Sequence, residues 1–244
     1  MILDIDAGNT RIKWRIVDGG EVIVRGDQST VSIRQEMPLK IPAVDRIARA
    51  RLSCVAGNEV VKNLQCQLKD QFDIQVELAE VTETAASVVC GYRDYKQLGV
   101  DRWLALATAY GQHTDAVIVV DVGSAITVDI VDAAGLHRGG YIVPGFQLMR
   151  KALWQGTEHI KVEPKHDVNA VSPGLSTADA VDKGCLLSIV SMVESLTAKY
   201  EARLVVTGGD AMILQNALSV NAELYADLVL DGLALDGICL RALN

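Results

Sequence analysis

A strand that ends in an Asp-x-Gly turn and continues into a second strand occurs twice in this chain. The first copy spans residues 2–17, with its turn at Asp6, and the second spans residues 117–131, with its turn at Asp121. Glycine lets backbone amides approach a phosphate closely, and a nearby carboxylate can hold a metal ion that bridges phosphates. The repeat therefore predicts two similar halves with a nucleotide cleft between them.

The length and the charge of the chain fit this interpretation. Its 244 residues allow one large domain or two of about 120 residues each, and the repeat favours two, at 1–114 and 115–244. Half of the residues are hydrophobic and 22% are charged, as in a well-buried globular protein. The net charge of −8 argues against a nucleic-acid partner, which usually requires a basic patch. Anionic substrates remain compatible, because a metal ion and local donors can hold a phosphate.

The cysteines and the apolar runs indicate a cytoplasmic protein. The five cysteines are dispersed and include no CxxC pair, so zinc and redox motifs have no support and reduced thiols are expected. The N-terminal residues lack the pattern of a signal peptide. No apolar run in the sequence approaches the roughly 18 residues of a membrane span, so we expect no membrane association.

Hydrophobic periodicity predicts an α/β fold. Helices are expected at 58–72, 100–112, 146–154, 178–200, 210–218 and 227–243. Further strands are expected at 51–56, 74–78, 137–143 and 203–207, and an irregular stretch at 157–177. A doubly wound nucleotide fold is the alternative, but the sequence contains neither a GxGxxG after a strand nor a GxxxxGK[ST] motif.

Five motifs stand in a fixed order along the chain. They are Asp6-x-Gly-Asn-Thr, Gly99-Val-Asp-Arg, Asp121-x-Gly-Ser-Ala-x-Thr-x-Asp, Gly139-Gly-x-Ile-x-Pro-Gly and Thr207-Gly-Gly. Each is weak alone, but together they resemble the type III pantothenate kinases, also called the Bvg accessory factor family, over nearly the whole chain. That family belongs to the acetate and sugar kinase, Hsp70 and actin superfamily. The resemblance implies two duplicated ribonuclease-H-like (actin-like ATPase) domains with a nucleotide cleft between them.

The resemblance also implies an activity, which is the ATP-dependent phosphorylation of pantothenate in coenzyme A synthesis, carried out by a homodimer. ATP with Mg²⁺ would be bound by Asp6, Ala7, Gly8, Asn9, Thr10, Arg11, Ile12, Lys13 and Ser124. The family usually has threonine where this chain has Ser124, and serine keeps the hydroxyl that can bond a phosphate. Asp6 would approach Mg²⁺ directly or through water. Asp121 matches the family's ligand for a monovalent cation, K⁺ or NH₄⁺, which would offset the repulsion between this carboxylate and the phosphates.

Pantothenate, by the same resemblance, would contact a second group of residues. They are Tyr92, Gly99, Val100, Asp101, Arg102 and Thr177. Asp101 is the implied catalytic base, and its place at the start of a predicted helix favours the ionised form. The guanidinium of Arg102 can bind the carboxylate of pantothenate in a bidentate manner. Without the resemblance, helix capping would be the favoured explanation of Asp101 and Thr177.

Two other functions stay open on the sequence. The first is another small-molecule kinase of the same superfamily, because a shared fold does not determine the substrate. The segment that contains Asp101 and Arg102 favours pantothenate. The second is a non-catalytic nucleotide-binding regulatory protein of the same fold. The presence of Asp6, Asp101 and Asp121 together argues against it, since a pure binding module has no need of all three acids.

Overall fold

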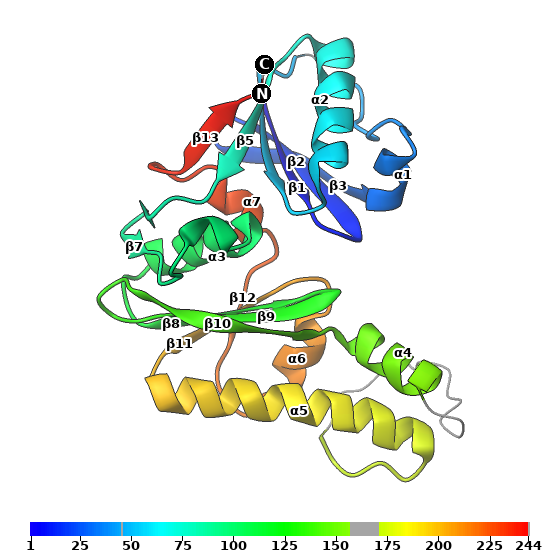
Figure 1. Cartoon of the computed structure of the whole chain (residues 1–244), viewed down its shortest axis with the longest axis vertical. Coiled ribbons are helices and arrows are strands. Elements are labelled where there is room, and N and C mark those ends of the chain that lie inside the picture. The colour runs from blue at the N-terminus through cyan, green and yellow to red at the C-terminus, as the bar shows by residue number, and fades with distance from the viewer. Residues whose placement is uncertain (45, 157–170, 244) are drawn as a thin grey trace. The chain divides into compact units, whose positions relative to one another are not determined.

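The computed structural model describes residues 1–44, 46–156 and 171–243. These residues form two compact units, one of Met1–Gly111 with Asp227–Asn244 and one of Gln112–Ala226 (Figure 1). The boundary expected from the sequence, after residue 114, lies close to Gly111, where the first part of the first unit ends. The last segment of the chain, from Asp227 onward, belongs to the first unit and not to the second. Most of the expected irregular stretch at 157–177 lies outside the described residues.

The first unit contains a six-stranded sheet in the order β13-β5-β4-β1-β2-β3. Its strands are β1 (Ile2–Ala7), β2 (Arg11–Asp18), β3 (Glu21–Ser29), β4 (Arg49–Cys54), β5 (Val76–Glu80) and β13 (Cys239–Ala242). The first three are antiparallel neighbours, while β4 is parallel to both β1 and β5. The remaining elements are α1 (Thr30–Arg34), α2 (Asn58–Phe72), β6 (Thr84–Ala85), β7 (Val88–Val89), the short 3₁₀ helix Tyr95–Gln97, α3 (Val100–Gly111) and α7 (Leu228–Gly232).

The second unit contains a five-stranded sheet in the order β10-β9-β8-β11-β12, which matches the order β3-β2-β1-β4-β5 of the first sheet. Its elements are β8 (Val117–Val122), β9 (Ala125–Val131), β10 (His137–Pro144), α4 (Phe146–Gly156), α5 (Thr177–Tyr200), β11 (Arg203–Thr207), α6 (Ala211–Ala217) and β12 (Glu223–Leu224). As in the first unit, the three consecutive strands are antiparallel and the next two are parallel. With β8 as the counterpart of β1, both sheets follow the order 3-2-1-4-5. This order confirms the duplicated ribonuclease-H-like architecture.

One face of the first sheet is apolar and the opposite face is charged. The apolar face packs against one stripe of α2 and includes Leu3, Ile5, Ala7, Ile12, Trp14 and Ile16 from the strands with Val60, Leu64 and Leu68 from the helix. Asp4 and Asp6 alternate with the apolar residues of β1, and successive strand residues point to opposite faces. The alternation that builds the core therefore also brings these two carboxylates to one face.

The second sheet is built by the same alternation. Residues Ile118, Val120 and Val122 of β8 belong to one apolar cluster with side chains of α5 and α6, and Figure 1 shows both helices on the same side of this sheet. Asp121 alternates with these residues and is half-buried. In both units, the aspartate of the Asp-x-Gly turn thus lies on the face opposite to the main helical core.

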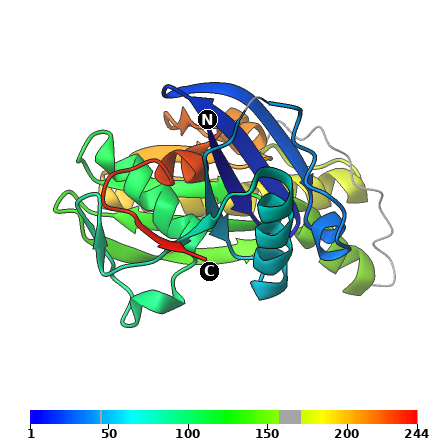
Figure 2. The ribbon, with the colours of Figure 1, turned by 90° about the horizontal axis from the view of Figure 1, so that it is seen from above.

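Five of the six predicted helices are present, but the sixth prediction is wrong. A helix was expected over 227–243, whereas α7 ends at Gly232 and the chain continues into β13 on the edge of the first sheet. Figure 2 shows this red segment running from α7 to the C-terminus. The chain turns at Gly237, which has φ +85°, a conformation that glycine tolerates. Pairing with β5 is a long-range interaction that outweighs the helical pattern of the sequence.

Candidate functional site

The turn after β1 is fixed by backbone hydrogen bonds. The amide of Gly8 donates to the carbonyl of Arg11 at 3.0 Å, and the amide of Thr30 donates to the carbonyl of Thr10 at 3.0 Å. The hydroxyl of Thr30 also donates to the carbonyl of Gly8 at 2.7 Å. Residues Asn9 and Thr10 are exposed at the tip. The turn is thus held from α1 and presents polar groups to solvent, as a phosphate-binding loop requires.

In the predicted ATP segment from Asp6 to Lys13, some side chains point into the apolar core and others point to the opposite face of the sheet. Ala7 and Ile12 are fully buried in the apolar core, so their side chains cannot contact a ligand and only their backbone can contribute. Arg11 forms an ion pair with Asp27 of β3. Lys13 lies directly opposite Asp6 in the β1–β2 register, so both side chains are on the same face of the sheet.

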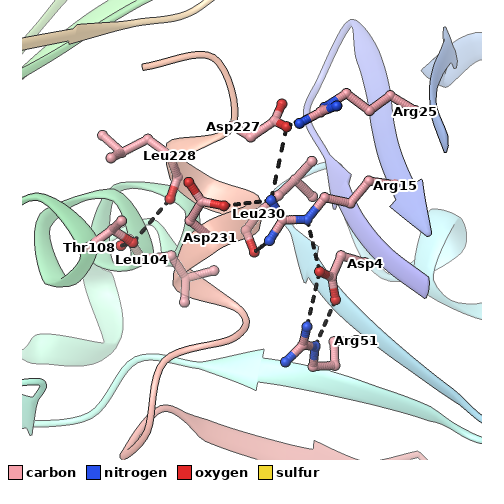
Figure 3. Close-up of polar contacts among 10 residues, drawn as sticks. All are labelled: Asp4, Arg15, Arg25, Arg51, Leu104, Thr108, Asp227, Leu228, Leu230 and Asp231. Atoms are coloured by element: carbon pink, nitrogen blue, oxygen red, sulfur yellow. Dashed lines mark hydrogen bonds and ion pairs between the residues drawn. The ribbon is translucent and has the colours of Figure 1, made fainter. Parts of the chain in front are cut away.

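A network of buried charges lies on the same face as Asp6, one row further along the strands. Asp4 is fully buried and accepts hydrogen bonds from Arg15 at 3.0 Å and from Arg51 at 2.7 and 3.0 Å (Figure 3). Arg15 also binds the carboxylate of Asp231 and the carbonyl of Leu230. This network joins β1, β2 and β4 to α7.

Electrostatics explain why Arg15 stays charged in this environment. Burial lowers the pKa of Arg15, but its hydrogen bonds to Asp231 and Asp4 raise it more, so the net pKa lies above its ordinary value. Removing one member would leave a buried charge unpaired, which is strongly unfavourable. This network was not predicted from the sequence. The alternation of Asp4 and Arg15 with apolar residues in two predicted strands was a signal that could have found it.

Asp101 is the second residue of α3, as the sequence predicted. One of its carboxylate oxygens, Oδ1, accepts a hydrogen bond from the backbone amide of Arg102 at 2.8 Å. A Cβ atom on Gly99 would lie only 2.5 Å from this oxygen. Glycine at position 99 therefore leaves the space that the carboxylate of Asp101 occupies.

The structure brings Tyr92 and Arg102 together. A guanidinium nitrogen of Arg102, Nη1, donates to the hydroxyl of Tyr92 at 3.0 Å, and the guanidinium carbon lies 5.6 Å from the centre of the tyrosine ring. Arg102 is only 8% exposed, so it is not the surface residue of an ordinary exposed ion pair. Together with Gly99, Val100 and Asp101, these two residues form one group at the start of α3.

In the second unit, Asp121 lies at the end of β8 against the Thr-Gly-Gly turn that follows β11. Thr207 is directly opposite Asp121 in the parallel register. Gly208 has φ +102°, and a Cβ atom at that position would come within 2.5 Å of the Asp121 carboxylate oxygen Oδ1. The closeness of this turn to Asp121 was not predicted from the sequence. A signal that could have shown it was that two apolar segments rich in β-branched residues, 117–120 and 204–206, are each followed by a polar residue and a glycine within the next three positions.

Ser124 and Gly145 belong to the same end of the second sheet. Ser124 is exposed, and its carbonyl accepts a hydrogen bond from the amide of Gly145 at 3.0 Å. A Cβ atom on Gly145 would lie 2.1 Å from the carbonyl oxygen of Gly123. The motif that ends at Gly145 therefore contributes to the shape of the Asp121 turn.

Two further polar residues of the second unit have defined surroundings. Asp129, the last acid of its motif, is buried and lies 3.1 Å from Nε2 of His137. Thr177 is the exposed first residue of α5. The helix is capped instead by Ser176, whose hydroxyl accepts a hydrogen bond from the amide of Asp179 at 3.2 Å. Capping therefore does not account for Thr177.

The predicted residues fall into both units. Asp6 to Lys13, Tyr92 and 99–102 belong to the first, while Asp121, Ser124 and Thr177 belong to the second. A separate pocket of about 420 Å³ in the first unit is lined by Arg46, Ile47, Ala48, Arg49, Phe72, Asp73, Ile74, Gln75, Glu77 and Ala242. These residues surround the start of β4, whereas Asp6 lies opposite the end of that strand, so this pocket does not involve the predicted site.

The donor set around Asp6 fits a magnesium–nucleotide complex better than a metal held by protein alone. Among the residues that the structure describes, no group of three or more His, Cys, Asp and Glu side chains could hold a metal ion. Mg²⁺ is commonly bound through one or two carboxylates together with substrate phosphates and water. A single carboxylate beside a polar turn is consistent with this mode of binding.

Comparison with known proteins identifies the family. The family model of the type III pantothenate kinases matches residues 2–199. This chain belongs to that family. A type III pantothenate kinase from Hahella chejuensis is 40% identical over 237 residues, which cover 95% of this chain and 94% of that protein.

Solved structures agree with the fold. A Campylobacter jejuni protein described as a Baf family transcriptional activator has a TM-score of 0.61 and 22% identity, with 95% of each chain covered. A Sinorhizobium meliloti protein described as a 2-dehydro-3-deoxygalactonokinase has a TM-score of 0.57 and 11% identity over 96% of this chain and 97% of that one. At these identities the likeness concerns the fold alone. No helix among the described residues is both long and apolar enough to cross a membrane.

Proposed function

We propose that this member of the type III pantothenate kinases transfers the γ-phosphoryl group of ATP to pantothenate with the residues described above. The reaction follows from membership of the family, and it yields 4′-phosphopantothenate for coenzyme A synthesis. The observation that best supports the assignment of residues is the group at the start of α3. There Tyr92, Arg102 and Asp101 lie together, and Gly99 leaves room for the carboxylate of Asp101.

In this proposal the turn from Asp6 to Lys13 binds the phosphates of ATP. Backbone amides and the exposed side chains of Asn9 and Thr10 donate hydrogen bonds, and Lys13 adds positive charge. Asp6 would hold Mg²⁺, directly or through water, and Mg²⁺ bound there would supply positive charge that offsets the phosphates. Ala7 and Ile12 contribute only backbone groups because their side chains are buried. Ser124 supplies a hydroxyl to a phosphate.

Asp101 acts as the base in the proposed mechanism. The hydroxyl oxygen of pantothenate attacks the γ-phosphorus, its proton passes to Asp101, and the bond to ADP breaks. In a loose transition state the proton leaves late, so orientation of the hydroxyl is the main contribution of Asp101. Arg102 binds the carboxylate of pantothenate, while Tyr92 holds the guanidinium and offers a ring wall. Val100 and Thr177 complete the contacts with this substrate.

Asp121 is proposed as the ligand of a monovalent cation, K⁺ or NH₄⁺. Thr207 and Thr127, its neighbours in the sheet register, carry no charge. A carboxylate close to ATP phosphates would be repelled by them, and a bound cation removes that repulsion. We further propose a cytoplasmic homodimer, since dimers with two-fold symmetry are the commonest oligomers.

Release of ADP from purified protein tests this function. ADP should form with ATP and Mg²⁺ only when pantothenate is present, and formation should be faster in K⁺ than in Na⁺ buffer. Equal rates in the two buffers would remove the cation assignment and leave the kinase reaction intact. Folded protein that binds ATP but does not respond to pantothenate would instead favour a different acceptor or the regulatory alternative.

A further inference from the structure

Ser53 is a buried residue that none of the sequence motifs includes. It lies near the end of β4, directly opposite Asp6 in the parallel β1–β4 register, and it is fully buried. Its hydroxyl donates a hydrogen bond to Oδ1 of Asp6 at 3.1 Å. A buried hydroxyl is costly without a partner, so this bond ties the orientation of the Asp6 carboxylate to the framework of the sheet.

The strands around this bond are held firmly on the same face. In the neighbouring row, Asp4 of β1 is bound by Arg15 of β2 and Arg51 of β4, as Figure 3 shows. Asp4 precedes Asp6 by two residues, and Arg51 precedes Ser53 by two. The buried ion pairs thus fix β1 against β4 immediately beside the Ser53–Asp6 bond, and Ser53 has a defined position from which to donate.

The chemistry of Mg²⁺ makes the orientation of this carboxylate important. Rotation of an aspartate carboxylate about its last torsion is broad and only weakly restricted. Mg²⁺ demands nearly ideal octahedral geometry and exchanges its water reluctantly, so a freely rotating ligand would place it poorly. A carboxylate has about four lone-pair sites, and one hydroxyl donor can therefore orient the group without using up its capacity for a cation.

We propose that Ser53 is a positioning residue that orients Asp6 for the magnesium–nucleotide complex. The inference rests on the proposed function in that it takes Asp6 as the carboxylate near Mg²⁺. The second unit supports it independently, because the equivalent place on β11, opposite Asp121, is occupied by another buried hydroxyl residue, Thr207. Both candidate cation-binding carboxylates thus have a serine or threonine beside them on the adjoining parallel strand.

Binding of Mn²⁺, a paramagnetic substitute for Mg²⁺, tests the proposal without relying on turnover. The variants Ser53→Ala and Ser53→Thr are titrated with Mn²⁺ in the presence of a non-hydrolysable ATP analogue, and free Mn²⁺ is followed by electron paramagnetic resonance. Ser53→Ala removes the hydrogen bond that orients the Asp6 carboxylate, so this variant should bind Mn²⁺ about tenfold more weakly or worse. Ser53→Thr keeps the hydroxyl and should restore most of the affinity. The KM for pantothenate should not change.

Thr108→Val provides the matched control, since it also removes a buried hydroxyl from the first unit. The hydroxyl of Thr108 contacts the carbonyls of Leu104 and Leu228 at 2.8 and 3.1 Å and no proposed ligand residue. This variant should lower the melting temperature but leave Mn²⁺ affinity unchanged. Equal Mn²⁺ affinity in Ser53→Ala and wild type, or an equal loss in Thr108→Val, would overturn the proposal.

The outcomes also separate this inference from the proposed function. Wild-type protein that binds Mn²⁺ with nucleotide but does not phosphorylate pantothenate would refute the kinase assignment, while a selective loss in Ser53→Ala would still support the positioning role. Wild-type protein that phosphorylates pantothenate while Ser53→Ala binds Mn²⁺ normally would refute only the positioning role. Wild-type protein that binds no Mn²⁺ with nucleotide would overturn both.

Discussion

The two Asp-x-Gly turns occupy equivalent places in the two units, yet their neighbours differ in charge. In the first sheet, Asp6 lies in a row with Ser53, Lys13 and Asp27 across adjacent strands. Lys13 supplies a positive charge beside the carboxylate, in addition to the metal ion that we propose there. The Asp27 carboxylate of this row forms an ion pair with Arg11, so the first turn carries a positive side chain of its own, Lys13, beside the proposed phosphate site.

The corresponding row of the second sheet contains no charged residue other than Asp121 itself. Its members are Thr207, Asp121, Thr127 and Ile142. Phosphates close to such a carboxylate would be repelled by it, because no positive side chain lies beside it. A cation bound from solution would remove this repulsion. Duplication preserved the strand order and the aspartate, while the neighbouring side chains differ in the way that the two proposed cation sites require.

Asp101 lies in neither turn, and its replacement should have the largest effect on the reaction. We expect Asp101→Asn to lower kcat by about 10²–10⁴-fold, the usual contribution of a general base, with little change in Mg²⁺ or K⁺ requirement. Steady-state kinetics measures this, and circular dichroism checks that the variant is folded. Wild-type turnover in folded Asp101→Asn would remove Asp101 as the base. An altered K⁺ requirement in this variant would contradict the separation of the base from the proposed cation site.

The residues two positions before the two turn aspartates also differ in charge. Asp4, two residues before Asp6, is a fully buried charge, whereas the equivalent residue of the second sheet is the buried Val119. Asp4→Asn should destabilise the protein by about 3 kcal/mol, since it leaves buried guanidinium groups without their shared carboxylate. Val119→Ala should cost about 2 kcal/mol, from the loss of two buried carbon groups. Urea unfolding measures both, and an equal or smaller effect of Asp4→Asn would contradict the contrast.

Removal of the Asp121 charge tests the difference between the two cation sites directly. Asp121→Asn should raise the K⁺ concentration for half-maximal activity about tenfold, which corresponds to about 1.4 kcal/mol, and leave the Mg²⁺ requirement near that of wild type. Asp6→Asn should show the reverse pattern. Both requirements are measured by titrating each cation at saturating concentrations of the other. Identical titration curves for the two variants would mean that the turns are not specialised.

The smallest expected effect on the K⁺ response concerns the position of the Asp121 carboxylate. Gly208 has φ +102°, and a Cβ atom there would come within 2.5 Å of this carboxylate and of the backbone oxygen of Val122, whereas a Cβ atom on Gly209 would meet nothing within 4 Å. Gly208→Ala should cost about 1–3 kcal/mol of stability from backbone strain and should also weaken the response to K⁺ a few-fold. Gly209→Ala should change neither. A loss of stability in Gly208→Ala with an unchanged K⁺ titration would limit Gly208 to a backbone role.

Most of the helices could be predicted from local sequence patterns. The helices at 58–72 and 178–200 were found almost to the residue, because a long apolar stripe at helical spacing depends only on neighbours in sequence. The C-terminal segment was misread because its edge-strand pairing with β5 is a long-range interaction. Ser53 was missed for the same reason, since nothing near it in the sequence shows that it lies opposite Asp6.

The sequence by itself determined the duplication, the family and the residue types of the candidate site, since each is encoded in ordered local motifs and their spacing. Only the tertiary structure decided which residues meet. Strand register placed Ser53 and Lys13 on either side of Asp6, and close packing left room for Asp101 and Asp121 only where residues 99 and 208 have no side chain. These contacts join residues far apart in the chain, and their geometry arises when the sheets form.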